Sequence, residues 1–126
     1  MFKFKLVERE DPAQRGLGGK LYATPIYQGI MGMPEIAKEI SGRSTTTYPD
    51  ILSVLQNFLE FLPFVMKLGY GIRLNDFGLL RIAFSSEGVD DPEDFDVTKI
   101  KRPRVTFLTS RNLREEIRNI KYSIVK

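Results

Sequence analysis

The chain has no cysteine and no histidine among its 126 residues. Without cysteine it has no disulfide framework, thiolate nucleophile or zinc-thiolate site, which fits a reducing compartment. Without histidine it lacks the commonest general base and the commonest metal ligand. No convergent set of acid, base and nucleophile can be named. The sequence therefore predicts a protein that is not an enzyme, with no catalytic residues, cofactor, metal or small-molecule substrate.

Long apolar runs are also missing. The one candidate, from Ile51 to Met66, is interrupted by Ser53, Gln56, Asn57 and Glu60 and falls short of the ~20 residues that span a bilayer. The N-terminus alternates lysine with phenylalanine and has no apolar centre of a cleavable signal. We therefore expect a cytoplasmic protein without membrane contact.

The totals of length and charge are unremarkable for one small domain. A length of 126 residues fits a single domain with its own core. The net charge of +3 is mild, so the distribution of charge is more informative than its total.

The central stretch, from Thr47 to Phe84, predicts a long helix followed by a hairpin. Thr47 and Asp50, with Pro49 in the first turn, are a capping signal. The polar residues between Ile51 and Met66 form one narrow stripe, so most of the helix circumference is apolar and needs cover on more than one side. Burial against a second copy is the economical solution, which predicts a homodimer.

A proline near the end of this helix and a turn-forming sequence beyond it predict where the elements end. Pro63 cannot donate a backbone hydrogen bond, which predicts a kink or an early end of the helix there. Two short strands, 70–74 and 79–84, follow, with the turn-forming sequence Asn-Asp-Phe-Gly at 75–78 between them.

The stretch Leu-Asn-Asp-Phe-Gly-Leu-Leu-Arg-Ile at 74–82 resembles the HU and integration host factor family of bacterial histone-like DNA-binding proteins. The family has a strand entering a Gly-Phe-Gly turn, and Asp76 stands in place of the first glycine. Residues 105–117 resemble the closing strand and third helix, with Thr109-Ser110 where the family usually has Pro-Gly.

This resemblance covers roughly residues 33–120, the predicted HU-like core of a single DNA-binding domain at 1–126. It implies an α+β fold with a helical hairpin, a small antiparallel sheet with a β-arm, and a C-terminal helix. It also implies an intertwined homodimer whose arms clasp double-stranded DNA through the minor groove and bend it. Residues 1–32 resemble the N-terminal β extension of a divergent HU-like subgroup.

The N-terminal region predicts two strands, a loop and a short helix. Residues 2–7 and 20–27 alternate as strands do, and the segment 11–19 between them is a loop. A phosphate-cradling role of the glycines at 16–19 is a weak alternative, since the Walker spacing differs. Pro34 begins a short amphipathic helix that ends near Gly42.

Residues 85–97 form an acidic segment with no basic residue, and we predict a solvated loop or poorly ordered tip. Its six carboxylates belong to Glu87, Asp90, Asp91, Glu93, Asp94 and Asp96. Their spacing does not match an EF-hand calcium loop, and a glycosidase pair would need a desolvated cleft.

The sign of the charge then reverses, which marks the candidate DNA-binding residues. Thr109 or Ser110 can cap a last helix whose inward face is Leu113, Ile117 and Ile120, and Tyr122 to Val125 could add a terminal strand. The candidates lie before and along that helix and are Lys99, Lys101, Arg102, Arg104, Arg111, Arg114 and Arg118.

Two functions remain open on this basis. The first is a nucleoid-associated protein that condenses DNA, contacting the duplex largely without sequence specificity. The arm lacks the family's Arg-Asn-Pro and its tip is acidic, which favours weak or altered binding over full bending. The second is an HU-fold protein-interaction or structural module that has lost DNA binding, with the basic helix as an ordinary surface neutralised by Glu115 and Glu116.

Overall fold

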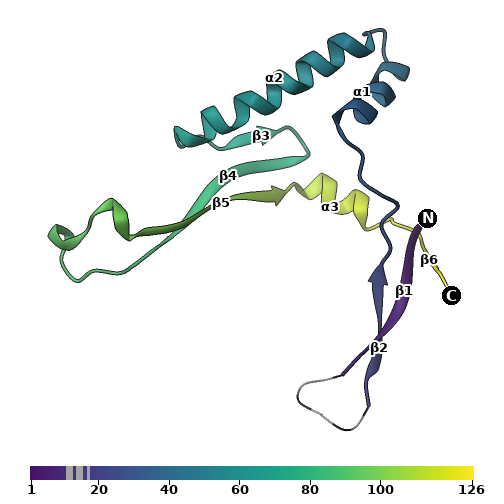
Figure 1. The fold of residues 1–126 in the computed structure, drawn as a ribbon, viewed down its shortest axis with the longest axis horizontal. Helices are drawn as coiled ribbons and strands as arrows, with labels where there is room; N and C mark the ends of the chain where they lie inside the picture. Colours follow the sequence, from purple (N-terminus) through teal and green to yellow (C-terminus); the bar gives the residue numbers. More distant parts are fainter. Residues whose placement is uncertain (11–12, 14–15, 17) are drawn as a thin grey trace. The chain divides into compact units, whose positions relative to one another are not determined.

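A computed structural model describes residues 1–10, 13, 16 and 18–126 (Figure 1). The chain divides into two compact units, one made of residues 1–31 with 116–126 and the other of residues 32–115. Each unit is described by itself below. A single domain over residues 1–126, with a β extension at 1–32 and a core at 33–120, stays a prediction.

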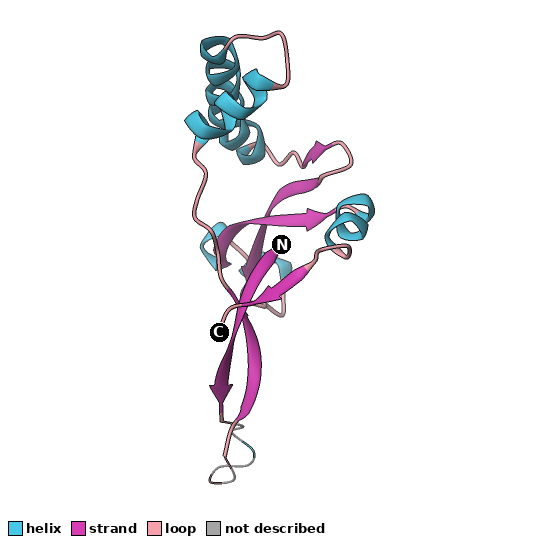
Figure 2. Cartoon of the chain, turned by 90° about the vertical axis from the view of Figure 1, so that its right-hand side faces the viewer, coloured by secondary structure: helices cyan, strands magenta, loops and turns pink. Residues whose placement is uncertain are grey.

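The first unit is a three-stranded sheet in the order β2-β1-β6 (Figure 2). Strand β1 (Phe2–Arg9) pairs antiparallel with β2 (Lys20–Pro25) and parallel with β6 (Tyr122–Ile124). The three predicted strands are confirmed, but β1 continues past Val7, because Glu8 and Arg9 are still paired with β2. The alternative reading of 16–19 as a phosphate loop rests partly on residue 17, which lies outside the described residues.

Two helices begin the second unit. Helix α1 (Met33–Gly42) and helix α2 (Tyr48–Lys67) lie where the sequence predicts them. Thr47 is the N-terminal flanking residue of α2, and its hydroxyl donates to the Asp50 carboxylate at 2.9 Å, with no side-chain bond to the helix backbone. The predicted early end at Pro63 is wrong: α2 continues to Lys67, since one missing N–H removes a single rung of the helix.

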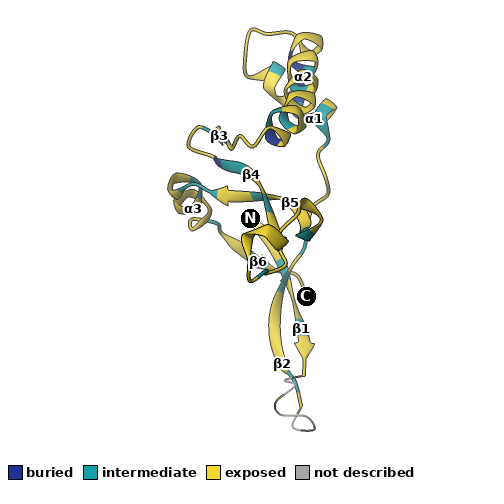
Figure 3. Cartoon of the chain, turned by 90° about the vertical axis from the view of Figure 1, so that its left-hand side faces the viewer, coloured by how far each residue is buried: buried dark blue, intermediate teal, exposed yellow. Residues whose placement is uncertain are grey.

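Helix α2 leaves most of its apolar arc exposed in the single chain (Figure 3). Val54, Phe61 and Phe64 are 66%, 56% and 65% exposed. The buried apolar side chains in the described residues are Ala37, Ile51 and Met66. The unit's own core is therefore small, and the exposed part of the arc has no cover within this unit.

The second sheet, in the order β3-β4-β5, is antiparallel throughout. Its strands are Ile72–Leu74, Gly78–Ser86 and Ile100–Thr109, and helix α3 (Arg111–Ile117) follows β5. We call β4, β5 and their connection the arm. The predicted loop at 85–97 is partly ordered into two 3-10 turns, Pro92–Asp94 and Val97–Lys99.

Within the described ranges, no helix combines the length and apolarity needed to cross a membrane.

Candidate nucleic-acid interface

Ser110 joins the start of α3 to the root of the arm, by which we mean the end where β4 begins and β5 ends. The Phe77 N–H closes the β3–β4 turn on the Leu74 carbonyl at 2.9 Å. The Ser110 N–H donates to the Phe77 carbonyl at 3.1 Å, and the Ser110 hydroxyl donates to the Asp76 carbonyl. Two of the three positions that depart from the HU pattern, Asp76 and Ser110, therefore contact each other.

Ser110 also begins α3, which confirms one of the two predicted caps. Its hydroxyl oxygen accepts from the Leu113 N–H at 3.1 Å, satisfying one of the free donors of the first turn. Ile117 was predicted to face inward and is 49% exposed instead. It ends the short helix, while Leu113 is half-buried.

Gly78 allows the two strands of the arm to approach closely. A Cβ atom at this position would lie 2.4 Å from Phe107 Cε2 and 2.5 Å from the Leu108 carbonyl oxygen. The Phe107 ring in turn packs on Phe77, with ring centroids 5.3 Å apart. The position therefore requires glycine for packing.

A β-bulge sets which side chains share a face of the arm. Ala83 pairs with Arg104 and Ser85 pairs with Lys101, so β5 has residues 102 and 103 where β4 has only residue 84. Directly paired residues point to the same face of a sheet, and alternate residues of one strand do so too. The extra residue therefore brings Lys101 and Arg104 to the same face, although a spacing of three would separate them in a regular strand.

The same register adds two arginines that the sequence analysis missed. Arg81 is two residues from Ala83, and Arg73 pairs with Leu79, so both side chains lie on the face of Arg104. We call Arg73, Arg81, Lys101 and Arg104 the arm face; all four are exposed. Arg73 and Arg81 are each the one charged residue of their strand. No local cluster of charge therefore indicates them in the sequence, and the strand pairing is needed to place them on this face.

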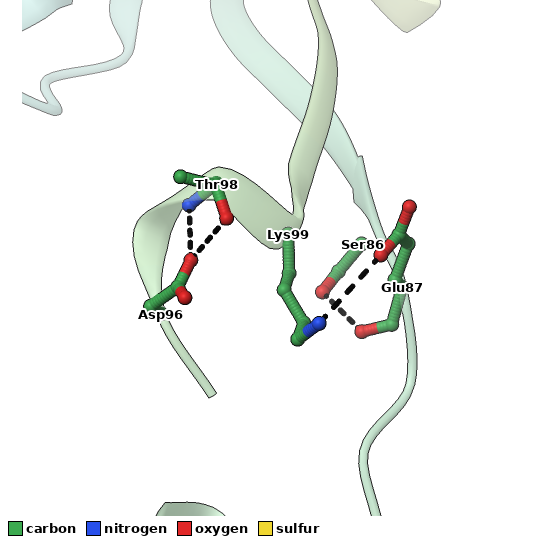
Figure 4. Close-up of polar contacts among 5 residues, drawn as sticks. All are labelled: Ser86, Glu87, Asp96, Thr98 and Lys99. Atoms are coloured by element: carbon green, nitrogen blue, oxygen red, sulfur yellow. Dashed lines mark hydrogen bonds and ion pairs between the residues drawn. The ribbon is translucent and has the colours of Figure 1, made fainter. Parts of the chain in front are cut away.

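Two other predicted residues, Lys99 in the turn before β5 and Arg102 in β5, lie in different surroundings. Lys99 is half-buried, and its Nζ is 3.9 Å from Glu87 Oε2, so part of its charge is neutralised (Figure 4). Arg102 is in the bulge with φ of +53°, a left-handed conformation, and its carbonyl accepts from Arg104 Nη1 at 3.3 Å.

The predicted helix residues lie on α3 or directly after it. Arg111 Nε donates to Glu115 Oε1 at 3.2 Å and forms an ion pair across one turn. Arg114 is exposed on the same helix. Arg118 follows the end of α3 and belongs to the other compact unit.

The tip of the arm uses some of its carboxylates as structural acceptors (Figure 4). Asp91 accepts from the Glu93 N–H at 3.1 Å, and Asp96 accepts from the Thr98 N–H at 2.7 Å and from the Thr98 hydroxyl. The Thr98 hydroxyl, and then its N–H, lower the pKa of Asp96. Across the described residues, no group of three acidic side chains is arranged to hold a metal ion.

Residues 1–123 match a family model named HU-HIG, an HU domain fused to a wHTH, Ig or glycine-rich motif. The chain belongs to this HU-like family. The predicted resemblance is thereby confirmed, and the three α-helices and small sheets of the described residues are consistent with an HU-like fold. The sheet of the first unit is not purely antiparallel, because β6 runs parallel to β1.

A crystal structure from Bacteroides vulgatus, solved as a candidate bacterial DNA-binding protein, resembles this HU-HIG chain with a TM-score of 0.63. The two sequences are 12% identical, and the match covers 98% of this chain and 47% of that one. The likeness therefore concerns the fold, and the chain spans about half the length of its structural relative. No curated protein sequence matches the chain.

Proposed function

We propose that this HU-HIG chain is a non-enzymatic DNA-binding protein of the nucleoid that contacts duplex DNA largely without sequence specificity. The contacts come from the arm face and from the other predicted cations, at positions 99, 102, 111, 114 and 118. The observation that carries the proposal is the bulge at 102–103, which gathers Lys101 and Arg104 on one face with Arg73 and Arg81.

The charges of the arm face have no competing carboxylate partner among the described residues. Within the described residues, none of its four cations forms an ion pair with a carboxylate. Exposed cations gathered on one face of a sheet suit a phosphate backbone, because affinity for it comes from neutralised phosphates and released counterions. Contacts to the DNA phosphate backbone position a protein on the duplex without distinguishing one base sequence from another.

A salt titration of binding to random-sequence duplex DNA tests this proposal. Neutralising Arg81, Lys101 and Arg104 to Gln should weaken binding to all sequences alike. The slope of log affinity against log salt should flatten by about 2 to 3 units, close to one per lost contact.

The matched control removes three charges from the helices instead, at Lys38, Arg43 and Lys67, again as Gln. This control should leave the slope within half a unit of the parent. Equal slopes for the two triple variants would contradict the role of the arm face. No duplex affinity of the parent at ~50 mM salt, where electrostatic binding is strongest, would remove the DNA function itself.

We also propose that the protein acts as a homodimer. The support is the exposed apolar arc of α2, where Phe61 and Phe64 are more than half exposed, because large exposed apolar patches mark interaction sites. Sedimentation equilibrium at micromolar concentration should give twice the chain mass of 14.5 kDa. A monomer alone would contradict the dimer.

The acidic tip favours one competing function, a protein-interaction module that keeps the fold without binding DNA. Asp90, Glu93 and Asp94 would repel a polyanion that reached the tip. The salt titration separates the two functions, since such a module binds no duplex at any salt concentration.

A further inference from the structure

The N-terminal sheet carries a second basic surface, distinct from the arm face. In the β1–β2 ladder, Lys5 pairs with Thr24 and Arg9 pairs with Lys20, and the Lys3 carbonyl accepts from the Ile26 N–H at 2.9 Å. Because paired and alternate residues share a face, four cations lie on one side of this sheet. We call Lys3, Lys5, Arg9 and Lys20 the hairpin face; all four are exposed.

Glu8 and Glu10, the carboxylates of the hairpin that the structure describes, do not neutralise this face. Glu8 alternates with Arg9 and lies on the opposite face, where its Oε1 accepts from the Gly19 N–H at 3.3 Å. Glu10 Oε1 accepts from the Gly16 N–H at 3.1 Å. In the part of the chain that the structure describes, no ion pair joins a hairpin-face cation to a carboxylate.

The arrangement of like charges calls for an external partner. Arg9 and Lys20 are directly opposite each other across the ladder, and like charges in that relation repel. Lysines on an edge strand can protect it from unwanted pairing. Three of the four cations lie on β1, which β6 covers only at Phe2, Lys3 and Phe4. Edge protection can therefore account for Lys5 and Arg9, but not for Lys3, and it does not require Arg9 and Lys20 to face each other.

The spacing favours a long polyanion over a small anion. From Lys3 to Arg9 the strand advances about 20 Å, and its basic residues recur at multiples of about 7 Å. A phosphate or carboxylate ligand would need cations that converge on one point. A row of this length fits a linear array of phosphates, such as the backbone of duplex DNA.

We propose that the hairpin face is a second duplex-binding surface, which contacts phosphates independently of the arm face. This inference rests on the proposed DNA function and extends it to the first compact unit. It assigns the N-terminal extension a share of the binding affinity, and it gives each chain two separate basic surfaces for DNA.

The test compares a variant with Lys3, Lys5, Arg9 and Lys20 all changed to Gln with the parent, using random-sequence duplex between ~50 and ~200 mM salt. The salt slope should flatten by about 3 units, so that this rise in salt weakens the variant about 60-fold less than the parent. A control with the same charge loss at Lys38, Arg43, Lys67 and Lys126 should keep the parent slope.

A charge-conserving variant separates charge from folding. Exchanging Lys and Arg at the four positions (K3R, K5R, R9K, K20R) should retain the slope, and circular dichroism should show the same fold for all variants. If the parent binds duplex but the Gln variant keeps its slope, the hairpin face is not a DNA surface, while the arm-face proposal stands. Stronger competition by single-stranded DNA than by duplex at this face would also overturn the inference.

Discussion

The root of the arm, where β4 meets the start of α3, and its tip, the connection between β4 and β5, are stabilised in different ways. At the root, backbone pairing, Gly78 and the Ser110 bonds fix the strands against each other. At the tip, the side chains of Asp91 and Asp96 accept from backbone N–H groups two residues further on. At the tip, aspartate side chains therefore satisfy backbone N–H groups, as the paired strand does at the root.

This comparison changes the meaning of the charges along the arm. The arm-face cations have no carboxylate partner among the described residues, so they are available to a ligand. Asp91 and Asp96 are engaged by the chain itself, and Glu87 is paired with Lys99. The acidity of the tip is therefore partly structural, and only part of it would oppose DNA.

The largest expected effect is a loss of stability on substituting Gly78, at the root of the arm. Replacing Gly78 by Ala places a methyl group against the Phe107 ring and the Leu108 carbonyl, so the strands must separate. We expect a loss of about 2 to 3 kcal/mol and a fall in melting temperature of roughly 10 °C. Gly88 at the tip is the control, because a Cβ atom there meets nothing within 4 Å. Equal melting of G78A and G88A would show that the root is no more constrained than the tip.

A moderate effect on duplex affinity is expected when carboxylates at the tip that accept no backbone hydrogen bond are neutralised. Changing Asp90 and Asp94 to Asn removes negative charge and leaves the Asp91 and Asp96 acceptors in place. Duplex affinity at ~50 mM salt should rise about fivefold, since each exposed charge contributes up to ~1 kcal/mol. A pair of Gln substitutions at Glu39 and Glu60 controls for net charge. If the control tightens binding as much, the tip does not approach DNA.

The smallest effect concerns the Thr98 hydroxyl. Thr98→Val removes the hydrogen bond that contributes most to the lowered pKa of Asp96, so this pKa should rise toward its usual range. Because the folded pKa lies below the unfolded one, Asp96 stabilises the tip at pH above about 3.9. That contribution is lost as the pH falls through the lowered value.

An NMR titration of the Asp96 carboxyl carbon measures this shift. The variant Thr98→Ser keeps a hydroxyl donor and should keep the lowered pKa. A parent-like pKa in Thr98→Val would mean that the backbone N–H of Thr98 alone holds the carboxylate.

Much of this fold could be predicted because its signals are local. Thr47 and Pro49 mark the start of α2, Gly69 with φ of +96° follows its end, and Ser110 caps α3. Each signal acts on groups within a few residues of its own position. Of the kink or early end predicted at Pro63, the early end was wrong, because the loss of one hydrogen bond is outweighed by the rest of a 20-residue helix.

The candidate site was harder to predict because it depends on pairing between distant residues. The bulge at 102–103 exists only relative to β4, so the shared face of Lys101 and Arg104 could not be read from β5 alone. Arg73 and Arg81 enter the site through the same register. The parallel pairing of β6 with β1 joins the two ends of the chain and leaves no local pattern.

The bulge also limits how the length of the arm can vary. Deleting either residue 102 or residue 103 would leave one residue opposite position 84, so the strand would alternate regularly and Lys101 would stay on the face of Arg104. Deleting both would make Lys101 the direct neighbour of Arg104 and turn it, with the side chains beyond it, to the opposite face. At this point of the arm a one-residue deletion should therefore keep the basic face, and a two-residue deletion should disrupt it.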